Sequence, residues 1–221
     1  AMIKCQNGKS GPDSEISDSK DFLIKWDTKL KISDDAARIT RFSQDKLDKL
    51  GKKPEEVFTT IREWLDESDY IVGHNVLGFD LYLIKELYKH FGLCYKHLVP
   101  KILDTNALAR GIKTNFKYDK SSSLMEYQYC MNNRRVRGVR TNLKAMGEEF
   151  GIEHDYDKLH DALVDLELNI KVWDNLCTSA LIYATPIIFS AITISIALYL
   201  ILVKKKNLNQ AAIAFDSQSQ F

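Results

Sequence analysis

Residues 73–80 read GHNVLGFD, and this stretch decides how the fold is interpreted. The apolar residues 70–73 that lead into it are typical of a short buried strand. After it, large apolar side chains recur between residues 81 and 91 at spacings of three and four, as they do on one face of a helix. The stretch therefore marks the turn from a strand into a helix, and Asp80 lies on the first turn of that helix.

A second stretch, residues 160–165, reads HDALVD and precedes another run with helical spacing. His160 and Asp165 are five residues apart, so on one continuous helix their side chains would point ~140° apart. They can converge only if His160 lies in the loop before the helix and Asp165 lies inside it. Asp161 is better suited to cap the start of this helix than to bind a metal.

The remaining chain alternates strand-like and helical segments, which is typical of a layered α/β domain. Residues 111–140 read as irregular and basic. The expected strands are 22–24, 70–73 and 102–105, and the expected helices begin at Ser33 and Pro54 or cover 107–110, 143–150 and 161–176.

Together, the stretches at 73–80 and 160–165 resemble the second and third motifs of the DEDDh 3′–5′ exonucleases. This superfamily contains the proofreading exonucleases of DNA polymerases and the RNase T-like nucleases. The resemblance covers roughly residues 21–176, and Asp104 with Thr105 resembles a pair often found between these two motifs. It implies an RNase H-like α/β domain in which helices flank a mixed sheet.

The resemblance also implies roles for individual residues. His160 matches the general base of the family, and Asp80 and Asp165 match ligands of two Mg²⁺ or Mn²⁺ ions. Two such ions about 4 Å apart activate a water and stabilise the leaving oxygen in phosphodiester cleavage. His74 and Asn75 shape the strand end or touch the substrate. The alternative is that Asp80 and Asp165 only favour helix starts and that His160 is merely solvated.

The first motif of the family, an Asp-x-Glu on a hydrophobic strand, has no convincing match. The only Asp-x-Glu before Asp80 is Asp13-Ser14-Glu15, which no apolar run precedes, and Asp27 has no glutamate two residues later. We therefore expect a sheet that lacks its first strands, with the motif upstream of Ala1 in a complete version. Asp80 and Asp165 alone carry too little charge to bring two dications together.

Charge is distributed unevenly along a chain whose formal net charge is only +1. Arg134, Arg135 and Arg137 belong to a basic cluster that can grip phosphates or can simply be a solvated loop. The four cysteines are scattered without zinc-site spacing, which is typical of free thiols in a reducing compartment.

The last part of the chain differs in character from the rest. Residues 180–203 contain no charged residue, and at ~1.5 Å per residue such a helix is long enough to cross a membrane. We expect four parts: a polar leader (1–20), an exonuclease-like domain (21–176), one transmembrane helix (180–203) and a basic, polar tail (204–221). By the positive-inside rule, Lys204, Lys205 and Lys206 place the tail in the cytosol and the domain outside. A span so close to the C-terminus instead resembles tail-anchored proteins, whose domain stays in the cytosol, and we favour this topology. The chain is cytoplasmic if the span is an artefact.

Three functions remain open from the sequence. The first is a metal-dependent 3′–5′ exonuclease, or a truncated relative, that acts on a DNA or RNA 3′ end and can have a DNA polymerase as a partner. The second is an inactive module that binds nucleic acid. The third is a membrane protein produced by an artificial fusion.

Overall fold

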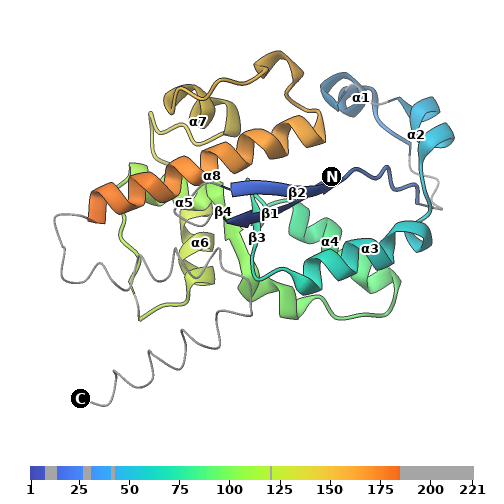
Figure 1. Cartoon of the computed structure of the whole chain (residues 1–221), viewed down its shortest axis with the longest axis horizontal. Helices are drawn as coiled ribbons and strands as arrows, with labels where there is room; N and C mark the ends of the chain where they lie inside the picture. Colours follow the sequence, from blue (N-terminus) through green and yellow to red (C-terminus); the bar gives the residue numbers. More distant parts are fainter. Residues whose placement is uncertain (8–13, 27–30, 41–42, 120, 185–221) are drawn as a thin grey trace.

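The structure is a computed structural model that describes residues 1–7, 14–26, 31–40, 43–119 and 121–184 (Figure 1). In chain order its elements, with 3₁₀ helices labelled η, are β1 (Met2–Asn7), β2 (Ser14–Lys20), α1 (Asp34–Thr40), α2 (Gln44–Leu50), α3 (Pro54–Glu67), β3 (Ile71–Gly73), α4 (Asp80–His90), η1 (Lys96–Lys101), β4 (Ile102–Asp104), α5 (Thr105–Lys113), α6 (Leu124–Asn133), α7 (Leu143–Glu149), η2 (Tyr156–Lys158) and α8 (Ala162–Ala184).

The centre of the molecule is the parallel pair β3 and β4, in which Ile71 is the register partner of Ile102. Successive residues of a strand point to opposite faces. Ile102 packs in one buried cluster with Leu81 of α4, whereas Leu103 packs in another with Trp173 of α8. Helices thus cover both faces of the pair, which fits the layered α/β, RNase H-like arrangement expected from the sequence.

Strands β1 and β2 form an antiparallel hairpin within residues that the sequence indicated as a polar leader. That prediction is wrong for residues 2–7 and 14–20. The hairpin escaped detection because most β2 side chains are exposed, so the segment has no apolar alternation to read. Polar contacts hold it instead: Lys4 pairs with Glu67 of α3 at 3.1 Å, and the Ser14 hydroxyl donates to Asp174 of α8 at 2.8 Å.

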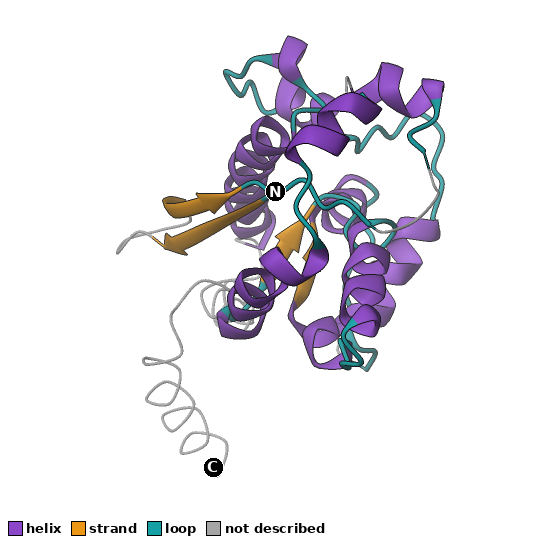
Figure 2. Ribbon diagram, turned by 90° about the vertical axis from the view of Figure 1, so that its right-hand side faces the viewer, coloured by secondary structure: helices purple, strands orange, loops and turns teal. Residues whose placement is uncertain are grey.

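The hairpin and the parallel pair form two separate two-stranded sheets among the described residues. Figure 2 shows the parallel pair among the helices and the hairpin projecting from one side of the molecule. The mixed sheet expected from the sequence is therefore present as an antiparallel and a parallel pair without hydrogen bonds between them in the described part of the chain. The predicted strand at 22–24 is reduced to an isolated bridge between Ile24 and Lys52.

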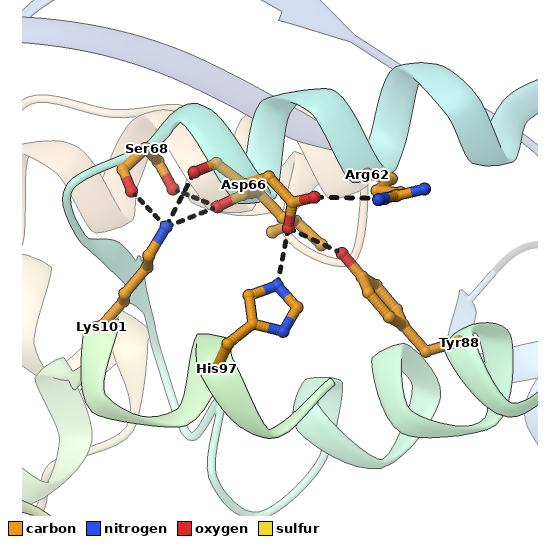
Figure 3. A network of polar contacts seen from close by, with 7 residues as sticks. Arg62, Asp66, Ser68, Tyr88, His97 and Lys101 are labelled. Carbon is orange, nitrogen blue, oxygen red and sulfur yellow. Dashed lines mark hydrogen bonds and ion pairs between the residues drawn. The ribbon is translucent and has the colours of Figure 1, made fainter. Parts of the chain in front are cut away.

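Helix α3 begins at Pro54 as predicted and buries one apolar face, which includes Val57, Ile61 and Leu65. The C-terminal end of α3 is capped by a side chain from another part of the chain. The Lys101 ammonium donates to the carbonyl oxygens of Leu65, Asp66 and Ser68 at 3.4, 2.8 and 2.9 Å. Figure 3 shows this contact, which satisfies carbonyl groups that a helix end leaves without partners.

The carboxylate of Asp66 lies beside this helix end and gathers three further side chains (Figure 3). His97 lies 2.7 Å from it, Arg62 donates to it at 3.2 Å, and the Tyr88 hydroxyl donates at 3.4 Å. Desolvation by the surrounding protein works against ionisation, yet the contacts with His97 and Arg62 hold the pKa of Asp66 below its ordinary value. The network ties α3 to α4 and η1.

Helix α6 lies within residues 111–140, which the sequence indicated as irregular. Its start carries a capping box, in which Ser123 and Glu126 each accept from the other's backbone N–H. Further along, the buried Gln128 side chain accepts from Asp104 N and donates to Ile102 O. The amide therefore occupies the outer edge of β4 and fixes α6 to the central pair.

Helix α8 begins at Ala162 and continues to Ala184, beyond the predicted end at 176. The first residues of the predicted membrane span, 180–184, continue this helix. Residues 185–203 of the span and the whole tail lie outside the described residues. Within the described part of the chain, no helix combines the length and the apolar character needed to cross a membrane.

Candidate active site

The loop 73–80 is held by a single buried carboxylate, that of Asp104 at the end of β4. Asp104 has no exposed surface, and its two oxygens accept from the backbone N–H groups of Asn75 and Leu77 at 2.9 and 3.1 Å. These bonds fix the loop that leads into α4. Asn75 adopts a positive φ of 61°, which asparagine tolerates better than most residues. A Cβ at Gly78 would lie 2.5 Å from Asn75 Oδ1, so only glycine allows this close packing.

The same carboxylate also organises the chain that follows it. Asp104 is the N-cap of α5 and accepts from Asn106 N at 3.0 Å and from Ala107 N at 3.4 Å. The Asn132 amide of α6 donates to its second oxygen at 2.8 Å. One acid thus joins the loop 73–80, the start of α5 and the end of α6, and a buried charge is stable only when it is bonded in this way.

Asp80 is the first residue of α4, as predicted, and its side chain is exposed. Protein atoms packed around the carboxyl nevertheless remove part of its hydration, and this desolvation raises the pKa of Asp80. The negative charge of Asp104 acts in the same direction. Asp80 therefore holds its proton more tightly than an ordinary aspartate, a property that a neighbouring cation would reverse.

His74 and helix α8 share one hydroxyl group, that of the buried Thr105. The hydroxyl lies 3.0 Å from His74 Nδ1 and donates to Asn169 Oδ1 at 2.8 Å. Burial lowers the pKa of His74, so the neutral ring is favoured near pH 7. Asn169 lies one helical turn after Asp165, and residues four apart share one face of a helix. Thr105 therefore connects His74 of the first stretch to α8, the helix that carries Asp165.

The turn at residues 160–165 is arranged as the sequence predicted. His160 lies before α8 with a φ of 80°, and Asp165 lies inside the helix. Asp161 caps the helix, since its side chain accepts from Leu163 N at 3.1 Å and from Val164 N at 3.5 Å. One oxygen of Asp165 accepts from the His160 backbone N–H at 3.1 Å. Asp165 thus helps to hold the turn in which His160 is exposed.

The acids predicted as metal ligands are too few to hold two dications. Among the described residues, no three His, Cys, Asp or Glu side chains gather closely enough to hold a metal. The oxygens of Asp104 are already used by N–H donors, which leaves Asp80 and Asp165. Mg²⁺ commonly keeps several waters and takes one or two carboxylates together with substrate phosphates. Two carboxylates therefore match one hydrated ion but not a pair of dications.

Of the candidates for the first motif, the structure describes only one. Glu15 lies on β2 with an exposed side chain, whereas Asp13 and Asp27 lie outside the described residues. The predicted substrate-binding residues Arg134, Arg135 and Arg137 are exposed and follow the end of α6. They are thus close in the chain to Asn132, whose amide bonds Asp104.

Residues 1–173 match the family model of the RNase T type, described as "Exonuclease". The chain belongs to this exonuclease family. The match includes both motif regions and also the hairpin β1–β2, which the sequence reading had left out of the domain. No curated protein and no solved structure matches the chain.

Membership of the exonuclease family makes a hydrolytic nuclease that binds nucleic acid the expected activity at family level. The residues that sequence reasoning missed are polar residues, partly or fully shielded from solvent, whose hydrogen bonds support the region of the predicted site. Asn169 and Asn132 went unnoticed, and Asp104 was noted only as a resemblance. An acid that ends a fully apolar strand and begins a helix is the signal that indicates such a buried cap.

Proposed function

We propose that this member of the exonuclease family is a metal-dependent 3′–5′ exonuclease that shortens single-stranded nucleic acid. The observation that carries the proposal is the shared hydroxyl of Thr105, which lies between His74 of the first stretch and Asn169 of α8. This contact supports a single site to which both motifs contribute. The family match over residues 1–173 supports the chemistry.

In this proposal each residue has a role that its position allows. Asp80 and the free oxygen of Asp165 hold a divalent ion, and phosphate oxygens of the substrate complete its shell. A bound ion of this kind supplies Lewis-acid stabilisation of the phosphate charge. His160, exposed on its turn, accepts a proton from the attacking water, a role in which imidazole side chains commonly act. His74 and Asn75 orient the terminal nucleotide.

The test uses single-stranded oligonucleotides labelled at one end, with and without Mg²⁺. A 5′ label should produce a ladder of shortened products, whereas a 3′ label should be released at once as a mononucleotide. A chelator should abolish both results. The reverse pattern of labels would contradict the 3′–5′ direction, and no shortening at high enzyme concentration would retire the exonuclease proposal for this chain.

Variants purified in parallel exclude a contaminating nuclease. Asp165→Asn and Asp80→Asn should each abolish the Mg²⁺-dependent shortening. Asp45→Asn is the matched control, because it removes an exposed carboxylate that pairs with Lys49 on the distant helix α2. Activity that survives in Asp165→Asn would belong to another protein or would require a different site.

A second candidate function is a non-catalytic module that binds nucleic acid. It is favoured by the use of Asp165 Oδ1 in a backbone bond and by the absence of a three-ligand group among the described residues. Salt-sensitive binding of single strands without turnover at any Mg²⁺ concentration would establish it. Changing Arg134, Arg135 or Arg137 to alanine should then weaken binding. Each change should also reduce the slope of log affinity against log salt concentration by about one unit, the share of one phosphate contact.

We also propose that residues 180–203 anchor the chain in a membrane with its domain in the cytosol. The span rests on the uncharged sequence of this segment, and the cytosolic side rests on the four free cysteines, which are typical of a reducing compartment. Recovery of the intact chain in membranes, with release only by detergent, is the expected result. An intact chain in the soluble fraction without detergent would remove the span.

A further inference from the structure

A group of aromatic side chains lies on the surface beside α6, away from the buried clusters. Phe116 and Tyr127 are stacked with ring centroids 6.2 Å apart, and Tyr118 meets Tyr127 edge to face at 5.6 Å. Phe116 is 39% exposed and Tyr118 is 43% exposed. Rings that only fill a core are covered, whereas these two present part of their surfaces to solvent.

The rings are oriented by hydrogen bonds within the same segment. The Tyr127 hydroxyl donates to Phe116 O, and the Tyr118 hydroxyl donates to Ser122 O, each at 2.8 Å. Both hydroxyl groups thus point inward at backbone carbonyls. The apolar parts of the rings remain available for contacts, in positions that are set before any ligand arrives.

A basic side chain completes the group. The Arg134 guanidinium lies over the Phe116 ring, 4.8 Å from its centroid. Residues 113–140 contain seven Lys and Arg but two Asp and Glu. The two acids, Asp119 and Glu126, are engaged with the backbone N–H groups of Ser121 and Ser123. The surface is therefore both aromatic and positively charged.

This surface is rigidly connected to the candidate active site. Arg110 of α5 donates to the carbonyl oxygens of Met131 and Asn132 at 2.8 Å each, which locks the end of α6. Asn132 in turn donates to Asp104, the acid that holds the loop 73–80. Arg134 follows two residues later, and two residues span at most about 7 Å. The aromatic surface therefore begins within about two residues of a side chain that bonds the acid holding the loop 73–80.

We propose that Phe116, Tyr118, Tyr127 and Arg134 form a stacking platform for the bases of single-stranded nucleic acid, a few nucleotides from the 3′ end. The platform rests on the proposed function, since it specifies that substrate as unpaired. Unpaired bases can stack on exposed rings, whereas bases in a duplex already stack on one another. Because the Arg134 guanidinium already lies over Phe116, a base stacks on this guanidinium plane or on the exposed part of Tyr118, and the N–H groups of Arg134 reach the phosphate backbone. Stacking of this kind does not depend on the identity of the base.

The experiment measures the affinity of the full chain for short fluorescent oligonucleotides in a chelator, so that no turnover occurs. It compares a normal single strand with an abasic strand of equal length and charge. Loss of stacking on one to a few bases should weaken binding by about 5- to 100-fold for the abasic strand. Equal affinity for the two strands would overturn the platform, because only phosphates would then be recognised.

Two variants separate stacking from charge. Phe116→Leu keeps an apolar side chain but removes the ring, so it should remove most of the preference for the normal strand. Arg134→Lys keeps the charge, but a lysine side chain has no planar group that can stack. It should therefore weaken binding of the normal strand more than binding of the abasic strand. Arg38→Lys is the matched control for Arg134→Lys, because Arg38 is exposed on α1 and pairs with Asp35. A preference that persists in Phe116→Leu, with the melting temperature unchanged, would overturn the proposal.

The outcome is distinguishable from failure of the proposed function. If the protein prefers the normal strand but never shortens it, the stacking platform is supported and the exonuclease proposal is contradicted. If the protein shortens strands but binds the normal and abasic strands equally, the exonuclease proposal is supported and the stacking platform is contradicted.

Discussion

The two motif regions look alike in sequence but differ in how the fold supports them. The loop 73–80 is held by Asp104, a fully buried acid with backbone and side-chain donors on both oxygens. The hydrogen bonds of the described turn 160–165 are local. The exposed Asp161 caps α8 and its backbone N–H donates to Lys158 O, and the half-buried Asp165 accepts from His160 N. The first region is fixed by tertiary structure and the second by local bonds, so changes in the first should cost far more stability.

The largest effect is expected for Asp104→Asn. The amide cannot accept from all the donors that surround the carboxylate, and it places an N–H₂ group against other N–H groups. The change should lower the free energy of unfolding by about 3 kcal/mol, since buried hydrogen bonds to a charge are strong and unsatisfied donors are costly. Urea unfolding measures it, with Asp45→Asn as control. A loss below about 1 kcal/mol would show that Asp104 is not the organising group.

Thr105→Val should have the next largest effect. Valine has nearly the shape of threonine but removes the hydroxyl that connects His74 to Asn169. Two buried polar groups lose their shared partner, which should cost about 1–2 kcal/mol. The matched control is Ser122→Ala, which removes a hydroxyl bonded to the exposed backbone at Asp119. Equal effects of the two variants in thermal or urea unfolding would contradict a special role for Thr105.

Asp161→Ala tests the local support of the turn. Removing an N-cap acid typically costs about 1 kcal/mol, because two N–H groups at the start of α8 lose their acceptor. Asp161→Asn should cost much less, since an asparagine side chain also caps well. If alanine and asparagine destabilise the protein equally, the contribution of Asp161 comes from its charge and not from capping.

The smallest effect is a pH dependence at Asp80. Desolvation raises its pKa in the folded state above the value in the unfolded chain. The folded protein therefore binds the proton more tightly between these two pKa values, and the contribution of Asp80 to stability increases as the pH falls through that window. Asp80→Asn should remove this contribution and leave the protein equally stable or more stable at pH 7. Unfolding curves across this pH range, compared with wild type, provide the measurement, and a loss of stability in Asp80→Asn would contradict it.

The comparison also explains what could be predicted from the sequence. Periodicity located α3, α4 and α8, because each buries one apolar face. The position of His160 before α8 followed from helix geometry alone. The hairpin β1–β2 did not follow, since Lys4 and Ser14 hold it through polar contacts with helices far away in the chain.

Helix α6 shows a different limit. Its capping box, Ser123 with Glu126, was readable in the sequence, but its apolar face is weak, and the buried residue that docks it is the polar Gln128. The roles of Asn132 and Asn169 depend on contacts with Asp104 and Thr105, which only the folded chain brings together. Buried polar partners of this kind have no periodic signature.

The closure of α3 by Lys101 has a consequence for chemical labelling. An ammonium group has three N–H bonds, and Lys101 directs its own at three carbonyl oxygens of the same helix end. An amine must lose a proton and turn its lone pair outward before it can react with an acylating reagent. Lys101 can do so only when the end of α3 opens, so the rate at which it is acylated reports how often that opening occurs.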